Sequence, residues 1–191
     1  MRTEFTAFDR CDTLTTFAIL LRGINVGGRN KLPMKSLVAI CEDLGCLDVK
    51  TYIQSGNVVL QCKKSAANRV AQQLTSAIEK QHGFAPHVMM LGLADLDRAM
   101  SSNPFPNAET EPATLHVSFL DATPKKPDLA KLEKLKKDTE RFQLKGRVFY
   151  LHAPDGIARS KLAAGIERAL GVPATSRNWR TLCKIIELCE I

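Results

Sequence analysis

Two polar regions of the sequence carry residue types that bind anions. The first, residues 22–28, reads Arg-Gly-Ile-Asn-Val-Gly-Gly and directly follows an apolar run. Glycine backbone N–H groups can turn toward a phosphate, and the N-terminus of a following helix adds positive potential. The residues of this region that could contact an anion are Arg22, Asn25, Gly27, Gly28 and Lys31. The alternative is a structural turn whose glycines adopt positive φ.

The glycine-rich region matches neither of the common nucleotide-binding loops. A Walker A loop requires Gly-Lys-Ser/Thr at the start of the helix, whereas residues 28–31 read Gly-Arg-Asn-Lys. A dinucleotide-binding loop requires Gly-x-Gly-x-x-Gly followed by a parallel crossover, and that spacing is missing. The sequence therefore argues against a standard nucleotide-binding fold, and we expect no cofactor.

The second polar region lies near the C-terminus in two basic runs. These runs supply the ligand-binding candidates Arg159, Ser160, Lys161, Arg177, Asn178 and Arg180. A helix predicted from Asn178 would place cations at its N-terminus, where they oppose the helix dipole. A bound anion would compensate for them. The alternative is that Ser176 or Asn178 caps the helix and acidic side chains pair with the arginines.

Few residues have the types and spacing needed for catalysis or metal binding. The polar groups to test first for catalysis are Ser55, Asn57 and His152. His152 and Asp155 could form an acid–base pair, and Ser55 would be a nucleophile only beside a base. The six cysteines form no Cys-x-x-Cys pair, and the four histidines form no i, i+4 pair. We therefore expect no metal site, and no reaction is assigned.

The net charge of +7 is carried by the C-terminal third of the chain. Residues 125–191 contain 15 Lys and Arg against 8 Asp and Glu, whereas residues 1–124 contain 12 of each. Such a basic segment suits an anionic partner, which could be nucleic acid, a phosphorylated ligand or an acidic surface. The lysine-rich helix at 131–137 is more typical of a solvated face. No apolar run is long enough for a membrane span, and the first residues lack a signal core, so we expect a cytoplasmic protein without membrane contact.

An RNA-binding strand is a further alternative. The segment 145–152 reads Lys-Gly-Arg-Val-Phe-Tyr-Leu-His and matches the RNA-recognition motif at Lys145, Gly146 and Phe149. Two of its three stacking positions lack an aromatic ring, and Phe149 and Leu151 are expected to face a core.

The order of predicted elements indicates a duplicated α+β fold. Strands are predicted near 17–21, 49–53, 58–62 and 86–91, with helices near 33–44, 66–81 and 93–100. This is a ferredoxin-like (split βαβ) order with an extra helix. The order then repeats, with strands near 115–120, 141–144, 148–151 and 174–175 and helices near 127–138, 160–170 and 178–189. We predict a tail at 1–15, a first half at 16–102, a linker at 103–112 and a second half at 113–191 with a C-terminal helix.

Seven sequence blocks together resemble a bacterial family known as domain of unknown function 1697. They are residues 18–28, 31–34, 51–59, 103–106, 150–157, 159–162 and 174–181. The resemblance covers about residues 16–190 and implies two ferredoxin-like halves, but no activity. Its polar blocks coincide with the regions singled out above. We therefore expect a basic cleft between the halves that binds a phosphate- or carboxylate-bearing ligand, with nucleic-acid binding or purely structural loops as the alternatives.

Overall fold

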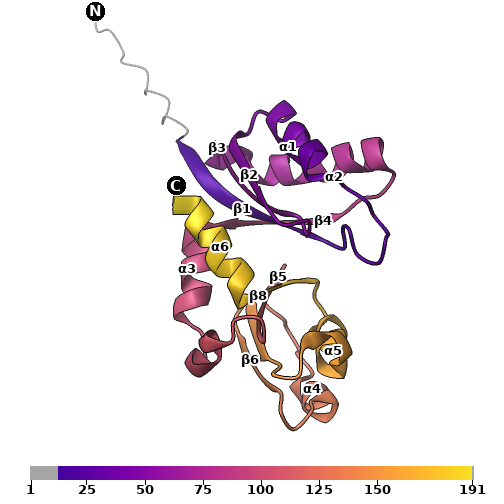
Figure 1. Ribbon diagram of the computed structural model, residues 1–191, viewed down its shortest axis with the longest axis vertical. Helices are drawn as coiled ribbons and strands as arrows, with labels where there is room; N and C mark the ends of the chain where they lie inside the picture. Colours follow the sequence, from indigo (N-terminus) through magenta and orange to yellow (C-terminus); the bar gives the residue numbers. More distant parts are fainter. Residues whose placement is uncertain (1–12, 191) are drawn as a thin grey trace, which may run out of the picture.

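The computed structural model describes residues 13–190 and shows two halves with the same order of elements (Figure 1). The first half comprises β1 (Leu14–Arg22), α1 (Met34–Asp43), β2 (Leu47–Tyr52), β3 (Asn57–Lys63), α2 (Ala67–His82), β4 (His87–Gly92) and α3 (Leu93–Ser101). The second comprises β5 (Leu115–Leu120), α4 (Leu129–Leu135), β6 (Arg141–Lys145), β7 (Val148–His152), α5 (Lys161–Leu170), β8 (Ala174–Asn178) and α6 (Trp179–Glu190). Three short 3₁₀ segments lie at Lys64–Ala66, Pro106–Thr110 and Ile157–Arg159.

Each half contains a four-stranded antiparallel sheet with the same topology. The strand orders are β2-β3-β1-β4 and β6-β7-β5-β8, so corresponding strands occupy corresponding positions. The predicted α+β class and the duplicated ferredoxin-like arrangement, with its C-terminal helix, are therefore correct. The repeat that the sequence suggested only through element order is a repeat of sheet topology.

The central strand β1 shows why its sequence is continuously apolar. Antiparallel sheets often leave one face in water, which produces an alternating pattern. Here Ile19 and Leu21 pack with α1 and α2 on one face, while Ala18 and Leu20 pack toward the second half on the other. Because both faces are covered, every residue of the run 17–21 is buried.

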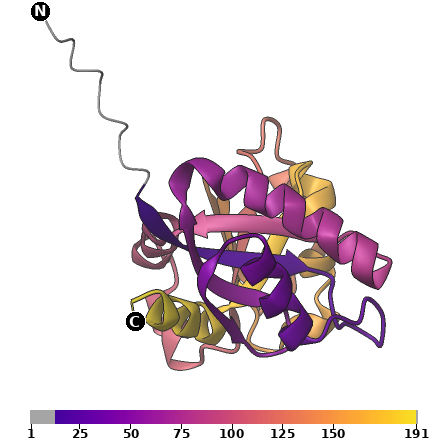
Figure 2. The ribbon, with the colours of Figure 1, turned by 90° about the horizontal axis from the view of Figure 1, so that it is seen from above.

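The two halves pack through the faces of their sheets that α1, α2, α4 and α5 leave open. A shared core between the sheets contains Leu20 and Leu91 from the first sheet and Val117 and Phe119 from the second. Helices α3 and α6 complete this core and lie together at one side of the molecule, as Figures 1 and 2 show. The junction is therefore tightly packed inside, and any ligand site at the junction must lie along its edges.

The structure corrects several predicted boundaries. Helix α4 spans Leu129–Leu135 rather than 127–138, because Asp128 caps its start and the backbone is extended at Lys136. Leu14 and Thr15 belong to β1 rather than to the predicted tail, and residues 1–12 of that tail lie outside the described residues. The predicted linker contains the 3₁₀ turn Pro106–Thr110 with a buried alanine.

None of the helices within residues 13–190 has the length and apolar character that crossing a membrane requires.

Candidate anion-binding site at the junction of the halves

The loop after β1 is closed by its own asparagine rather than opened toward a ligand. The Asn25 amide nitrogen donates to the carbonyls of Leu32, at 2.9 Å, and Gln54, at 2.8 Å. The Asn25 carbonyl oxygen accepts the Leu32 N–H at 2.8 Å. Both ends of this side chain are thus used to satisfy backbone groups. Asn25 is therefore a loop-closing residue, and the structure does not favour its assignment as a ligand contact.

The glycine pair forms the exposed tip of the same loop. Arg29 N donates to the Val26 carbonyl at 3.0 Å, and Gly27 and Gly28 have φ of 58° and 75° between them. Two consecutive positive φ values define a type I′ turn, which glycine adopts without strain. Helix α1 begins only at Met34, so neither these glycines nor the exposed Lys31 lies at its N-terminus. The structure favours the structural turn over the predicted phosphate cradle, and Figures 1 and 2 show the loop extending outward from the first half.

The turn between β2 and β3 is ordered by a buried asparagine. Asn57 donates from its amide to the Tyr52 carbonyl at 3.0 Å and to the Ser55 hydroxyl oxygen at 2.9 Å. Within residues 13–190 no base contacts that hydroxyl, so the arrangement lacks the partner that a serine nucleophile requires. These residues therefore present acceptors, the Asn57 carbonyl oxygen and the Ser55 backbone carbonyl, to a neighbouring cation.

That cation is Arg177, which reaches from β8 of the second half into the first. Its Nε donates to the Asn57 side-chain oxygen, and its Nη2 donates to the Leu21 and Ser55 carbonyls at 2.7 and 3.0 Å. Its Nη1 donates to the Ser176 carbonyl at 2.8 Å. A guanidinium has five N–H donors, so one Nη1 proton has no acceptor among residues 13–190.

All the partners of Arg177 are neutral. No carboxylate in residues 13–190 pairs with this guanidinium. Burial lowers the pKa of Arg177 to about 10, which still leaves it charged at neutral pH. A desolvated cation without a counter-charge makes the surroundings attractive to an anion, because the local dielectric screens it poorly.

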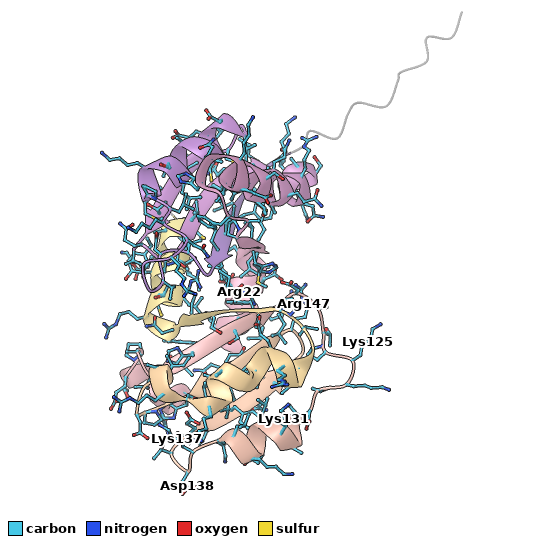
Figure 3. All side chains as sticks on the ribbon, turned by 90° about the vertical axis from the view of Figure 1, so that its right-hand side faces the viewer. Arg22, Lys125, Lys131, Lys137, Asp138 and Arg147 are labelled. Carbon is cyan, nitrogen blue, oxygen red and sulfur yellow. The ribbon has the colours of Figure 1, made fainter. Side chains whose placement is uncertain are left out.

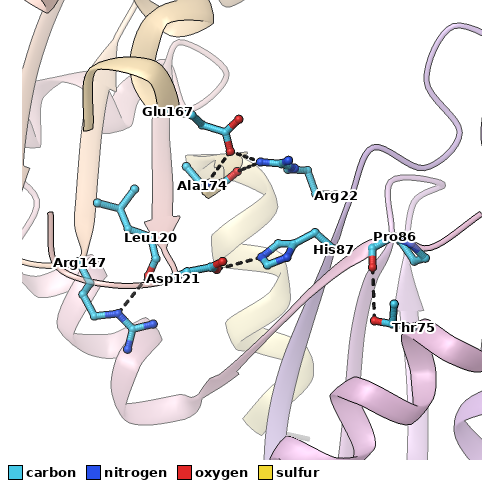
Figure 4. Close-up of polar contacts among 9 residues, drawn as sticks. All are labelled: Arg22, Thr75, Pro86, His87, Leu120, Asp121, Arg147, Glu167 and Ala174. Carbon is cyan, nitrogen blue, oxygen red and sulfur yellow. Dashed lines mark hydrogen bonds and ion pairs between the residues drawn. The ribbon is translucent and has the colours of Figure 1, made fainter. Parts of the chain in front are cut away.

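Arg22, at the end of β1, lies beside the same region. It forms an ion pair with Glu167 of α5, and its Nη1 lies 3.4 Å from the Ala174 carbonyl (Figure 4). The same Glu167 oxygen accepts the Ala174 N–H at 2.7 Å. Almost half of each charged side chain is exposed, at 42% for Arg22 and 46% for Glu167. Ion pairs with this exposure are weak, so a competing anion could displace the glutamate.

Arg22 and Arg177 line one hollow at the junction of the halves, with a volume of about 400 Å³. Its polar lining is completed by Ser176 and Glu167, and its apolar lining comes from α5 and the start of β8. This volume is within the usual range for small-molecule sites. We call it the junction hollow. Chemically it can offer two guanidinium groups and a hydroxyl to a carboxylate or phosphate.

The other predicted ligand contacts at residues 159–161 do not line the junction hollow. Ser160 is buried and caps α5 by accepting the Ala163 N–H at 3.0 Å. Arg159 and Lys161 are exposed at that same end of the helix. Lys161 precedes Glu167 by six residues, which is about 9 Å along a helix. The expected convergence of Arg22 with Arg159 and Lys161 is therefore not found, because α5 separates them.

The start of α6 follows the capping alternative. Asn178 accepts the Thr181 N–H at 2.9 Å and so satisfies a free N–H group of the first turn. Arg180 is exposed and lines a different cavity with Tyr52 and Lys184. Arg177 therefore lines the junction hollow, and Arg180 does not.

His152 belongs to a separate cluster. Its Nδ1 lies 3.1 Å from Arg141 Nη2, and its ring packs 6.3 Å from that of Phe105. Burial first, and the Arg141 charge second, lower the pKa of His152. Asp155 instead accepts the Thr139 hydroxyl at 2.8 Å, so the predicted acid–base pair is not formed. Nothing in this cluster places His152 near the junction hollow.

The strand predicted as an RNA-stacking platform is covered on both faces. Phe149 and Leu151 are 0% exposed in the core under α4 and α5, and Tyr150 is 0% exposed in the core between the sheets. Base stacking requires aromatic rings on an open face. Several lysines that contribute to the positive charge of the second half lie outside this strand. Figure 3 shows Lys125, Lys131 and Lys137 spread over the surface of that half, away from Arg22.

Sequence reasoning missed Glu167, whose carboxylate pairs with Arg22 on the lining of the junction hollow. It also missed the contact across the junction between His87 Nε2 and Asp121 Oδ1 at 2.9 Å (Figure 4). Glu167 follows no motif, because it lies within an ordinary amphipathic helix. Only the three-dimensional arrangement of α5 against β1 reveals its position.

The family described as protein of unknown function (DUF1697) matches residues 14–150. The chain belongs to this family. A solved structure, that of the conserved bacterial protein SP0830 from Streptococcus pneumoniae, is similar with a TM-score of 0.63 and 26% identity. The match covers 93% of this chain and 99% of that one. No curated protein matches the sequence.

The comparisons support the resemblance inferred from the sequence blocks. The family match ends at residue 150, so it does not include the blocks at 159–162 and 174–181. The structural similarity extends over nearly the whole chain and supports a conserved two-part fold. The description of the family names no reaction.

Proposed function

We propose that this protein binds a small ligand bearing a phosphate or carboxylate group in the junction hollow. The observation that carries the proposal is Arg177, a half-buried cation held only by neutral acceptors within residues 13–190. Arg22 lies on the same hollow, and its present partner is a half-exposed glutamate. The ligand anion would replace the Glu167 carboxylate on Arg22 and add the charge that Arg177 lacks.

The contacts of Glu167 support an assignment of the donors that such an anion would use. Its carboxylate is held by a guanidinium and by a backbone N–H, that of Ala174. The same combination of a charged fork and a backbone donor recognises phosphate and carboxylate groups in proteins. Ser176, which pairs with Ser118 through its hydroxyl, adds a third polar group on the lining. The remaining lining is apolar and would contact the body of the ligand.

The experiment compares phosphate binding to three variants by isothermal titration calorimetry. Arg22→Gln should weaken binding about tenfold or more, because it removes one charge-assisted contact. Glu167→Gln should strengthen binding, because the competing negative charge is removed while an amide oxygen can still accept the Ala174 N–H. Arg159→Gln removes the same charge as Arg22→Gln, but outside the hollow, and should leave binding unchanged.

The proposal predicts opposite changes in phosphate affinity for Arg22→Gln and Glu167→Gln, which makes the outcome decisive. Equal affinity for phosphate in Arg22→Gln and the unmodified protein would overturn the proposal. So would a loss in Arg159→Gln as large as that in Arg22→Gln, because phosphate would then be responding to net charge alone.

A further inference from the structure

A second cavity lies at the junction, away from Arg22 and Arg177. Its volume is about 270 Å³, and it is bounded by β4 and α3 of the first half and by the β6–β7 hairpin of the second. Leu91, Phe119 and Val148 contribute to its apolar lining. We call it the hairpin cavity. In Figure 4 the contact between His87 and Asp121 lies between Arg147 of the hairpin cavity and Arg22 of the junction hollow.

The inner wall of the hairpin cavity is fixed in place. Tyr150 is fully buried and donates its hydroxyl to the Ala99 carbonyl of α3 at 2.7 Å. Burial raises the pKa of Tyr150 to about 12, so the phenol is a neutral donor at physiological pH. This bond joins the wall formed by the second sheet to the helix of the first half. A preformed apolar wall of this kind reduces the entropy lost when a ligand binds.

Three cations surround this apolar wall. Lys145 Nζ donates to the Ser102 carbonyl at 2.8 Å, and Arg147 Nε donates to the Leu120 carbonyl at 3.0 Å. The Nη groups of Arg147 have no protein partner among residues 13–190, and the Arg98 side chain makes no hydrogen bond or ion pair there. The carboxylate on the lining, that of Asp95, accepts the Gly92 N–H at the start of α3. The cavity thus has an excess of positive charge and free guanidinium donors.

We propose that the hairpin cavity is a second binding site, for a compact apolar molecule with an anionic head group. The head group would bind the free donors of Arg147 and Arg98, and the apolar body would contact Met90, Phe119 and Val148 in front of the buried Tyr150 ring. The volume is slightly below the ~300 Å³ at which drug-sized sites begin, so the body is limited to about one ring or one short branched chain. The site stands independently of the junction hollow, because it shares none of the lining residues.

The test uses phenylacetate as the probe and follows the amide signals of the ¹⁵N-labelled protein. Saturable shifts are expected at Ser102 and Gly146, which line the cavity. Phenylacetamide has the same shape without the charge. It should bind at least about tenfold more weakly, as expected when a charge-assisted contact is lost. Arg147→Gln should weaken phenylacetate binding by a similar factor. Lys125→Gln makes the same change of charge outside the cavity and should have no effect.

Arg22→Gln distinguishes this site from the junction hollow. It should leave phenylacetate binding at the hairpin cavity unchanged although it weakens phosphate binding at the junction hollow. Equal binding of phenylacetate and phenylacetamide would overturn the proposal. Shifts confined to residues outside 98–102 and 145–148, or an absence of saturable shifts, would also overturn it.

Discussion

Replacing Arg177 by glutamine is expected to lower the free energy of unfolding by about 2–4 kcal/mol, because several buried acceptors would lose their donor together. Those acceptors are the Asn57 side-chain oxygen and the carbonyls of Leu21 and Ser55. They belong to the first half and the arginine to the second, so the loss also weakens the junction. Lysine should not restore stability, because one ammonium cannot reproduce the planar fork that reaches all three.

Urea unfolding followed by circular dichroism measures this effect. The matched control is Arg180→Gln, which removes the same charge three residues along the chain from an exposed side chain. The control should change stability by no more than about 0.5 kcal/mol. If both variants lose the same amount, the contacts of Arg177 across the junction are not a main source of stability.

Replacing Gly56 by alanine is expected to destabilise the protein by about 3 kcal/mol or more, because backbone strain and steric overlap add. Gly56 has φ of +74°, and an added Cβ would lie 2.7 Å from Leu21 Cβ and 2.8 Å from Ile24 Cδ1. Gly56 also accepts the Leu21 N–H at 2.8 Å, which holds the β2–β3 turn against the end of β1. Shifting this turn would displace the Ser55 carbonyl and the Asn57 side chain, which hold Arg177.

Gly28 provides the control for this prediction. Its φ is +75°, but an added Cβ would meet nothing within 4 Å. Gly28→Ala should therefore cost only the backbone strain, about 1–2 kcal/mol. The difference between the two midpoints of thermal unfolding isolates the steric effect. Indistinguishable midpoints would show that the turn relaxes away from Leu21.

Much of the fold follows from local patterns in the sequence. The apolar run at 17–21 predicts β1 because a central strand that is covered on both faces needs no polar positions. The pairing of the β2–β3 and β6–β7 hairpins follows from turn residues between short strands. The length of α4 was overestimated, because its lysine-rich continuation has helical composition but an extended backbone at Lys136. Neither helix propensity nor charge pattern signals that change.

The candidate site was only partly predictable, for a physical reason. Asn25 is a polar residue in a loop, and Asn57 and Asn178 lie at strand ends beside a turn and a helix start. Such positions are typical of ligand contacts. Each of their side chains instead bonds to backbone groups that would otherwise lie unpaired. Such groups are invisible in a sequence. The approach of Arg22 to Arg177 also depends on how the two sheets pack, and Glu167 joins them only because α5 lies across that junction.

The most direct test of the junction hollow is to follow the Nε–H signals of the arginine side chains by NMR while inorganic phosphate is added. The proposal predicts saturable shifts of the Arg22 and Arg177 signals with one common dissociation constant, while the exposed Arg159 and Arg180 signals change little. Shifts of Arg159 and Arg180 without those of Arg22 and Arg177, or shifts that grow linearly at all four arginines, would contradict an anion site at the junction of the two halves.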